Sequence, residues 1–346
     1  MIFRKLKQIN FQSKVIAVTL FLKIFKIILI NFIVFIGILL FLECLVRISV
    51  GGKINYQGSS SNLLKDSVYF DSYGLAPGIT GYSHGAKITV NSYGLRGPEV
   101  NFNKQKKNIL LIGDSVLMGV GLPDSCTISS YFLNSIQDSS YQILNTGVMG
   151  YSIYDYLNVL RVWVDKLDIK CLFLFYCLND VYRVNKFDQK VIKIQKHRDN
   201  LIIEKTLNFF RCYSKLYLFL KNILFKRGNA YYLYDYRIYK DDKERIREGM
   251  GTIQLIQSIC KDNGIDFNFV ILPYKYQYTN ISSDSWYPQN LVKKYLSTSD
   301  INIIDLRYVF QNEKDISNFY LYGDPIHFSK LGTFKIVKAI YDLDLY

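Results

Sequence analysis

The chain has 346 residues, of which 49% are hydrophobic, so it is long and apolar enough for one large domain with appendages or for two small domains. It carries 43 lysines and arginines against 29 acidic residues, and its formal charge of +14 favours anionic surroundings such as phospholipid headgroups or acidic polymers. No zinc finger, helix-turn-helix spacing or RNP-like aromatic motif accompanies this charge, so no nucleic-acid partner is expected.

The six cysteines lack C-x-x-C pairs and regular spacing, which argues against a zinc site and against a dense disulfide framework. Cys171 and Cys177 fall on one predicted strand, where about 3.3 Å per residue separates them by roughly 20 Å. That separation is far beyond the reach of a disulfide. We therefore expect these two cysteines not to be bonded to each other.

A long apolar stretch covers residues 15–42, is interrupted by Lys23 and Lys26, and continues after Glu43. About 20 residues at 1.5 Å each cross the roughly 30 Å hydrocarbon layer of a bilayer. The residues before it are basic and include no acid, so the positive-inside rule places the N-terminus in the cytoplasm and everything after about Arg47 across the membrane. These basic residues are Arg4, Lys5, Lys7 and Lys14.

Two other interpretations of this stretch are a cleaved signal peptide and a buried core helix. The apolar part is longer than a signal-peptide core, no A-x-A cleavage site follows it, and a core helix would show a polar face. The sequence therefore predicts an uncleaved, single-pass membrane anchor within residues 1–50, with an extracytoplasmic domain behind it.

Residues 51–107 are rich in Gly, Ser, Tyr and Asn and are predicted to form a linker with one marginal strand at 87–91. Arg96, which follows that strand, is either a surface charge or an anion-binding group near a site. His84 in this segment and His197 further along the chain are interpreted as surface residues.

A buried parallel strand is predicted at residues 108–112, because a short apolar run ends there in the turn Gly113-Asp114-Ser115. A serine at a sharp strand-to-helix turn has its hydroxyl exposed at the edge of the sheet, beside the free N–H groups of the next helix. Ser115 is therefore a candidate nucleophile. The alternative is an ordinary turn in which Asp114 or Ser115 caps the helix.

The same strand-and-helix pattern then repeats, with helices at 127–137 and 153–166 and strands at 141–144 and 171–178. Alternating strands and helices imply a parallel sheet, in which the carboxyl ends of the strands share one edge. Gly150 and Asn179 follow two of these strands, as Ser115 follows the first. Each alone is interpreted as a turn or a cap, but together the N–H groups of Ser115 and Gly150 and the amide of Asn179 are candidates for binding an oxyanion.

His327 lies in a loop between a predicted strand at 301–306 and a predicted helix at 329–343. Asp324 precedes it by three residues in a stretch that Pro325 stiffens. A carboxylate at that spacing can accept the imidazole N–H and leave the other ring nitrogen free to take a proton from a serine. The alternative is a capping aspartate beside a half-buried histidine.

Four sequence blocks resemble those of the SGNH (GDSL-like) hydrolase family in their order and approximate spacing. They are Gly113-Asp114-Ser115, Gly150 in V-M-G-Y-S, Asn179-Asp180, and D-P-I-H from Asp324 to His327. The resemblance covers roughly residues 108–346 and implies an α/β, flavodoxin-like three-layer fold with a central parallel sheet. It also implies the site roles: Ser115 as nucleophile, His327 as base, Asp324 as its orienting partner, and Ser115, Gly150 and Asn179 as the oxyanion hole.

The stretch at residues 91–97 resembles one that precedes the catalytic domain in membrane-anchored bacterial members of that family. Two positions depart from the family pattern. Val116 replaces the leucine of G-D-S-L, and Cys177 stands where many members have a glycine, close to Asn179.

An insert at about 181–243 interrupts the α/β pattern, and its basic and aromatic residues predict one amphipathic helix at 203–225. Three roles are open for this helix: it covers the margin of the sheet, it forms a lid over the site, or it rests on anionic lipid. The core then resumes with helices at 243–263 and 289–296 and a strand at 267–272.

Together these features predict a membrane-anchored serine esterase that acts on ester-linked acyl groups of envelope polysaccharide or lipid through an acyl-Ser115 intermediate. An O-acyltransferase with the same triad and a non-catalytic polysaccharide-binding protein are the alternatives. No metal or cofactor is expected, since H-E-x-x-H, Walker and G-x-G-x-x-G motifs are absent from the sequence. The acyl group, the acceptor and the oligomeric state are left open.

Overall fold

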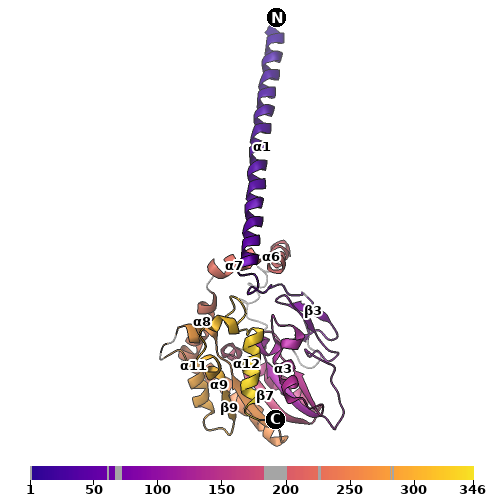
Figure 1. Cartoon of the computed structure of the whole chain (residues 1–346), viewed down its shortest axis with the longest axis vertical. Coiled ribbons are helices and arrows are strands. Elements are labelled where there is room, and N and C mark those ends of the chain that lie inside the picture. The colour runs from indigo at the N-terminus through magenta and orange to yellow at the C-terminus, as the bar shows by residue number, and fades with distance from the viewer. Residues whose placement is uncertain are drawn as a thin grey trace. The chain divides into compact units, whose positions relative to one another are not determined.

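The computed structural model describes residues 2–60, 62–66, 72–182, 201–224, 227–280, 282 and 284–346. The chain divides into two compact units, Met1–Gly52 and Lys53–Tyr346, whose elements are traced in Figure 1. Each unit is considered by itself.

The first unit is one helix, α1 (Ile2–Ser49). Its part Val18–Ser49 is long and apolar enough to cross a membrane. Large side chains along it, such as Phe21, Phe32 and Phe41, are exposed. A membrane anchor and a signal sequence share this length and composition.

The second unit is built on a five-stranded sheet in the order β6-β5-β7-β8-β9, and every pairing in it is parallel. The predicted parallel sheet is therefore confirmed, with strand ends within about two residues of those expected. The strands β5 and β7 lie in the middle and are almost wholly buried, as continuous apolar runs require. The strands are β5 (Lys107–Gly113), β6 (Tyr141–Asn145), β7 (Ile169–Tyr176), β8 (Asp266–Ile271) and β9 (Asn302–Asp305).

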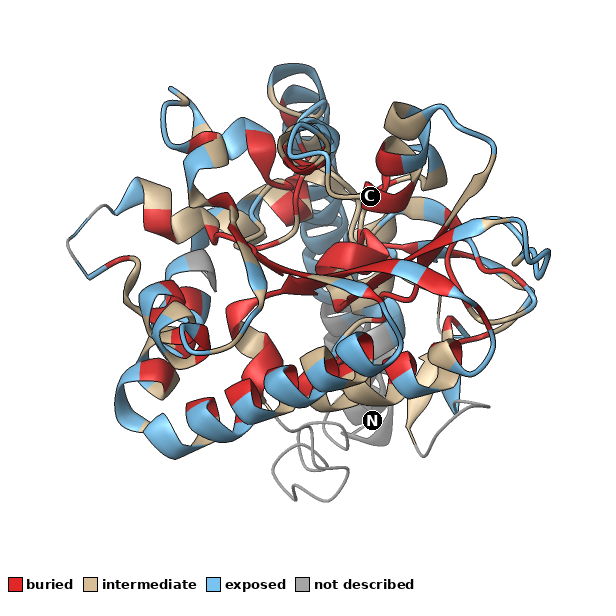
Figure 2. Cartoon of the chain, turned by 90° about the horizontal axis from the view of Figure 1, so that it is seen from below, coloured by how far each residue is buried: buried red, intermediate tan, exposed pale blue. Residues whose placement is uncertain are grey.

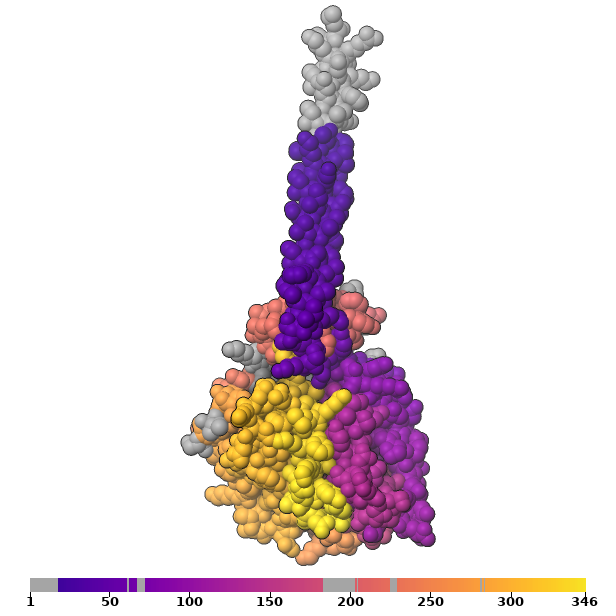
Figure 3. Space-filling view, viewed as in Figure 1, coloured from indigo at the N-terminus to yellow at the C-terminus, as the bar shows by residue number. Residues whose placement is uncertain are grey.

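Helices cover both faces of this sheet and complete a three-layer α/β fold. On one face α3 (Ile128–Ile136) packs against α12 (Lys330–Tyr341), and Figure 3 shows the C-terminal segment directly beside the segment that holds α3. On the other face α9 (Lys243–Asp262) packs against α4 (Ile153–Val164) and α11 (Tyr287–Leu296). Figure 2 shows buried strands between helices whose outward sides are exposed.

Residues 51–107 hold more structure than the expected linker with one marginal strand. Two antiparallel hairpins form there, β1 (Leu64–Asp66) with β2 (Tyr73–Leu75) and β3 (Thr80–Ser83) with β4 (Ala86–Thr89). Leu75, Ile88 and Leu95 are buried in the same core as the central strands. The segment is therefore packed onto the α/β unit, and it brings the tip of the β3–β4 hairpin to the edge of the sheet where the site lies.

Arg96 is neither a surface charge nor an anion-binding group, the two roles considered from the sequence. Its side chain is 1% exposed and donates to the backbone carbonyls of Met118, Gly119 and Leu122. It also forms an ion pair with Asp124 at 3.0 Å. The fork of five donors in a guanidinium suits this task, because one buried side chain satisfies several carbonyls of an irregular loop.

The insert contains three helices in its described part, α6 (Leu201–Tyr213), α7 (Lys215–Leu224) and α8 (Arg227–Asp241). The single helix expected at 203–225 is therefore wrong. The break falls at Ser214, whose hydroxyl accepts a hydrogen bond from the backbone N–H of Tyr217 at 3.0 Å and so caps a new helix. His197 and the start of the insert lie outside the described residues.

Candidate active site

The turn that follows β5 holds Ser115 at the first position of the short helix α2 (Ser115–Met118). Asp114 caps this helix: its carboxylate accepts from the backbone N–H of Val116 at 2.8 Å, and its Oδ2 lies 3.1 Å from Oγ of Ser115. A Cβ at Gly113 would lie 2.8 Å from the side chain of Leu117, so the tight turn needs glycine there. The capping interpretation of Asp114 is thus confirmed, and the same turn presents Ser115 at the sheet edge.

The loop between η4 (Ile316–Phe319) and α12 brings His327 to Ser115, which is 212 positions away in sequence. Nε2 of His327 lies 2.9 Å from Oγ of Ser115, and Nδ1 lies 2.8 Å from Oδ2 of Asp324. The other oxygen of Asp324 accepts from the backbone N–H groups of Ile326 and His327 at 2.9 and 2.8 Å. These backbone bonds fix the carboxylate, which in turn fixes the orientation and tautomer of the imidazole.

The electrostatics of this pair favour an imidazole beside a charged carboxylate. Burial lowers the pKa of His327, but the charge of Asp324 and its hydrogen bond outweigh burial, and the net pKa lies above its usual value. Burial raises the pKa of Asp324, but the charge of His327 and the hydrogen bonds from His327 and Ile326 lower it by more. The net pKa of Asp324 is therefore below its usual value. Asp324 therefore stays ionised and stabilises a proton on His327.

The three candidate oxyanion donors lie just past the ends of three neighbouring strands, β6, β5 and β7. Ser115 is the first residue of α2, so its backbone N–H has no partner within the helix. Gly150 has a φ of 78°, and a Cβ there would lie 2.7 Å from the hydroxyl of Tyr73. Glycine therefore suits both the backbone conformation and the space at this position.

Asn179, in the 3-10 helix η2 (Leu178–Val181), is held by residues that the sequence did not single out. The hydroxyl of Tyr274 lies 3.0 Å from Oδ1 of Asn179 and 2.8 Å from Oδ2 of Asp235, on α8 of the insert. This hydroxyl has one proton for the two oxygens, and when Oδ1 of Asn179 accepts it, the amide NH₂ of Asn179 is the group left for a ligand. Burial raises the pKa of Asp235 to about 6. In the sequence, Tyr274 is one of several aromatic residues in the loop after β8, and no motif marks it.

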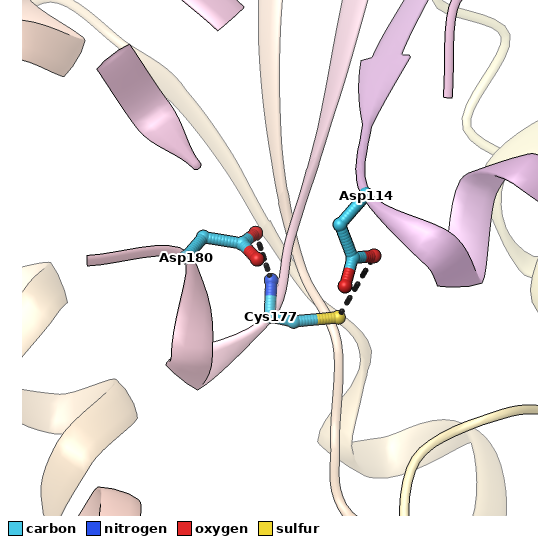
Figure 4. Close-up of side chains that lie close together, drawn as sticks. All are labelled: Asp114, Cys177 and Asp180. Atoms are coloured by element: carbon cyan, nitrogen blue, oxygen red, sulfur yellow. Dashed lines mark hydrogen bonds between the residues drawn. The ribbon is translucent and has the colours of Figure 1, made fainter. Parts of the chain in front are cut away.

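Three buried groups lie behind the nucleophile turn: Asp114, Cys177 and Asp180, with ligand atoms within 4.8 Å of one another. Figure 4 shows Cys177 between the two carboxylates, with its thiol donating to Asp114 at 3.7 Å and its backbone N–H donating to Asp180 at 2.7 Å. Burial raises the pKa values of Cys177 and Asp180 well above normal, which favours their protonated forms. A metal needs deprotonated ligands, so this cluster fits hydrogen bonding that shapes the turn better than it fits a metal.

His84 is not the surface residue that its turn-rich segment suggested. The tip of the β3–β4 hairpin places its ring 6.2 Å from the ring of His327, centroid to centroid. Burial is the main reason that the pKa of His84 falls to about 4, and the neighbouring His327 adds to the decrease. His84 is therefore a neutral imidazole beside the Ser115–His327 pair, contributed by a segment outside the four sequence blocks.

Comparisons with known proteins give structural likenesses at low identity. No family model matches the chain, and no curated protein matches it. An acetyl xylan esterase, AlAXEase, is 15% identical with a TM-score of 0.42, over 68% of this chain and 98% of that one. The acetylxylan esterase Axe2 from Geobacillus stearothermophilus is 13% identical with a TM-score of 0.40, over 69% and 95%. A member of the lipolytic protein G-D-S-L family from Veillonella parvula is 14% identical with a TM-score of 0.38, over 69% and 98%. At these values the likenesses assign no activity to this chain.

Proposed function

We propose that this protein is a serine esterase that cleaves ester-linked acyl groups through a covalent acyl-Ser115 intermediate. The observation that carries the proposal is the unbroken chain of hydrogen bonds from Ser115 through His327 to Asp324. A serine is a weak nucleophile until a neighbouring base takes its proton, and a base works best when a third group holds its tautomer. The three side chains satisfy both requirements.

In the first half of the reaction, Oγ of Ser115 attacks the ester carbonyl carbon while its proton passes to Nε2 of His327. The bond between carbon and the alcohol oxygen then breaks, and His327 gives that proton to the departing alcohol. In the second half, a water molecule attacks the acyl-enzyme, gives its proton to His327, and releases the acid as Ser115 takes the proton back. An alcohol in place of that water makes the reaction an acyl transfer.

The negative charge that develops on the carbonyl oxygen needs donors on the side opposite to His327. Its proposed donors are the backbone N–H groups of Ser115 and Gly150 and the amide of Asn179. One such donor is typically worth about 10² to 10³ in rate. The hydroxyl of Tyr274 accepts from the backbone N–H of Asn179 at 3.2 Å and lies 3.0 Å from its Oδ1, and these contacts support a preorganised amide, which is the condition for this effect.

Labelling with a fluorophosphonate tests the nucleophile, because these reagents bond covalently to activated serines. We expect the full chain in detergent to be labelled on the peptide that contains Ser115 and to hydrolyse p-nitrophenyl acetate. Ser115→Ala should lose both properties, whereas Ser125→Ala, at an exposed serine nearby, should keep them. A folded chain that takes no label would support the non-catalytic binding alternative, and a label kept in Ser115→Ala would show that another residue is the nucleophile.

We further propose that α1 anchors the enzyme in a membrane with its N-terminus in the cytoplasm and the α/β unit on the other side. The length and apolar surface of Val18–Ser49 and the basic residues before it support this topology. Acyl groups on envelope polysaccharide or on lipid are then the substrates within reach. Alkaline carbonate should leave the full-length chain in the membrane pellet; release of the intact chain into the supernatant would contradict the anchor.

A further inference from the structure

A cavity of about 210 Å³ opens beside the catalytic histidine. Several separate segments contribute its polar walls, among them the hairpin tip with His84, helix α7 with Lys221 and Asn222, and the loop that carries Asp324 and His327. The insert thus reaches the site directly, since a Cβ at Gly323 in that loop would lie 2.6 Å from the side chain of Asn222.

The lining of the cavity includes the candidate base but none of the candidate oxyanion donors. His327 lines it, whereas Ser115, Gly150 and Asn179 do not. In the proposed reaction His327 gives its proton to the departing alcohol and takes one from the incoming water or alcohol. The oxygen atom of that alcohol must therefore lie next to Nε2 of His327. A group attached to the alcohol oxygen therefore lies near His327, which is one of the residues that line this cavity.

His84 is held at this place by its hairpin. His84 and Gly85 are the two residues between β3 and β4, and both have positive φ, 45° and 78°, as a type I′ turn requires. The backbone N–H of His84 donates to the hydroxyl of Ser59 at 3.1 Å. The left-handed φ therefore follows from the turn, and the position of the ring follows from the turn and this bond.

The ring of His84 has hydrogen-bonding capacity that the chain does not use. Its Nδ1 is buried and has no hydrogen-bond partner among the residues that the structure describes. A neutral imidazole offers one donor and one acceptor, and buried polar atoms in proteins are nearly always paired. Nε2, the other ring nitrogen, is not among the buried unpaired atoms and makes no hydrogen bond within the described part of the chain, so it is the atom that meets a hydroxyl group of an alcohol in the cavity.

Lys221 places a positive charge on the wall of the same cavity. Nζ of Lys221 donates to Oε1 of Gln57 on the cavity wall at 2.6 Å. The charges of Lys221 and Arg211 both act on His84 and help to lower its pKa, so both cations lie within electrostatic reach of that ring. Asp324, the carboxylate among the described residues that line the cavity, is hydrogen-bonded to His327. A negatively charged substituent on the alcohol would therefore be attracted to this wall.

From these observations we propose that the cavity is the subsite for the alcohol part of the substrate, that His84 hydrogen-bonds a hydroxyl group of that alcohol, and that Lys221 selects an alcohol that carries a carboxylate or a phosphate. The inference rests on the proposed esterase function and narrows its substrate class to esters of anionic alcohols. An acidic sugar and a phosphorylated lipid headgroup share this chemistry.

Matched esters test the charge preference. The probes are acetylated methyl glucuronide against acetylated methyl glucoside for the sugar, and acetyl glycerol 3-phosphate against acetyl glycerol for the headgroup. We expect the anionic ester of at least one pair to have the higher kcat/KM, and Lys221→Gln to reduce that preference about tenfold through KM. Lys205→Gln, at an exposed lysine of α6, should leave it unchanged. Equal loss on both esters of each pair, or no loss, would overturn the proposal.

A second variant tests the hydrogen bond from His84. We expect His84→Ala to reduce kcat/KM for the sugar ester about tenfold relative to p-nitrophenyl acetate. His84→Asn should restore part of this ratio, because asparagine accepts a positive φ and keeps a hydrogen-bonding amide. An equal loss on both esters would instead mean damage to His327 and would contradict a substrate-binding role.

Binding without turnover separates this inference from the esterase function. Calorimetry with free methyl glucuronide, methyl glucoside and glycerol 3-phosphate needs no reaction. If the chain hydrolyses no ester but binds the anionic alcohols in a Lys221-dependent way, the subsite stands and the esterase function fails. If it hydrolyses p-nitrophenyl acetate but binds neither anionic alcohol, the subsite fails alone.

Discussion

Asp324→Asn is expected to lower kcat for ester hydrolysis by about four orders of magnitude with little change in KM, the size of effect seen when a triad carboxylate becomes an amide. Oδ2 of Asp324 accepts from Nδ1 of His327 at 2.8 Å and holds the tautomer in which Nε2 faces Ser115. A neutral amide neither holds that tautomer reliably nor stabilises the imidazolium that forms when Ser115 is deprotonated. Initial rates at saturating p-nitrophenyl acetate measure the loss.

The pH profile of the same variant gives an independent readout. His327 must be neutral to take the proton of Ser115, so kcat/KM falls as pH drops through its pKa. The charge of Asp324 and its hydrogen bond raise that pKa against the opposing effect of burial. Removing the charge should therefore move the acidic limb of the profile to lower pH, even though the plateau is much lower.

The loop around Asp324 should survive this change, because an asparagine oxygen can still accept from the backbone N–H groups of Ile326 and His327. Asp300→Asn, at an exposed carboxylate, serves as the matched control and should keep the wild-type rate and profile. A folded Asp324→Asn chain with a wild-type kcat, or with an unmoved acidic limb, would contradict the assigned role.

Arg96→Met is expected to reduce the free energy of unfolding by about 3–5 kcal/mol, the usual effect of removing one partner from a buried ionic network. The change leaves three backbone carbonyls, those of Met118, Gly119 and Leu122, without the guanidinium that satisfies them. It also removes the partner of Asp124. Denaturant unfolding of the full chain in detergent measures the difference.

Arg247→Met provides the control for Arg96, because Arg247 forms an exposed ion pair with Glu244 at 2.9 Å. Pairs of this kind contribute between about 0 and 1 kcal/mol. The loop whose carbonyls Arg96 satisfies follows directly after α2, which begins with Ser115. Arg96→Met should therefore also lower ester turnover at temperatures where the chain is still folded. Equal stability of the two variants would show that Arg96 is dispensable for the loop.

The parallel sheet was predictable because the information for it is local. Each central strand is a short apolar run that ends in polar or glycine-containing turns, and helical segments separate the runs. Right-handed crossovers then bring the strand ends to one edge. This reasoning also placed Ser115, Gly150 and Asn179 at that edge, and the distance of 2.9 Å between Ser115 and His327 agrees with the pairing that their motifs suggested.

Local patterns were insufficient where a helix break or a single side chain decides the structure. The apolar and basic periodicity of residues 203–225 continues through Ser214, so periodicity alone predicted one helix instead of two. Arg96 lies among turn residues, and only the loop at 118–124 that it satisfies explains why it is buried. In both cases specific hydrogen bonds decide the structure, and the periodicity of the sequence does not reveal them.

By itself, the sequence determined the apolar N-terminal helix and the α/β parallel architecture, because each depends on local apolar patterns, and the motifs of Ser115, Asp324 and His327 suggested the hydrogen-bonded contacts that the structure shows. Only the tertiary structure revealed His84 beside His327, and the support of Asn179 by Tyr274 and Asp235. These contacts join segments that are dozens to hundreds of residues apart. They exist because a hairpin and an insert helix pack against the sheet edge, and no local pattern encodes which side chains meet there.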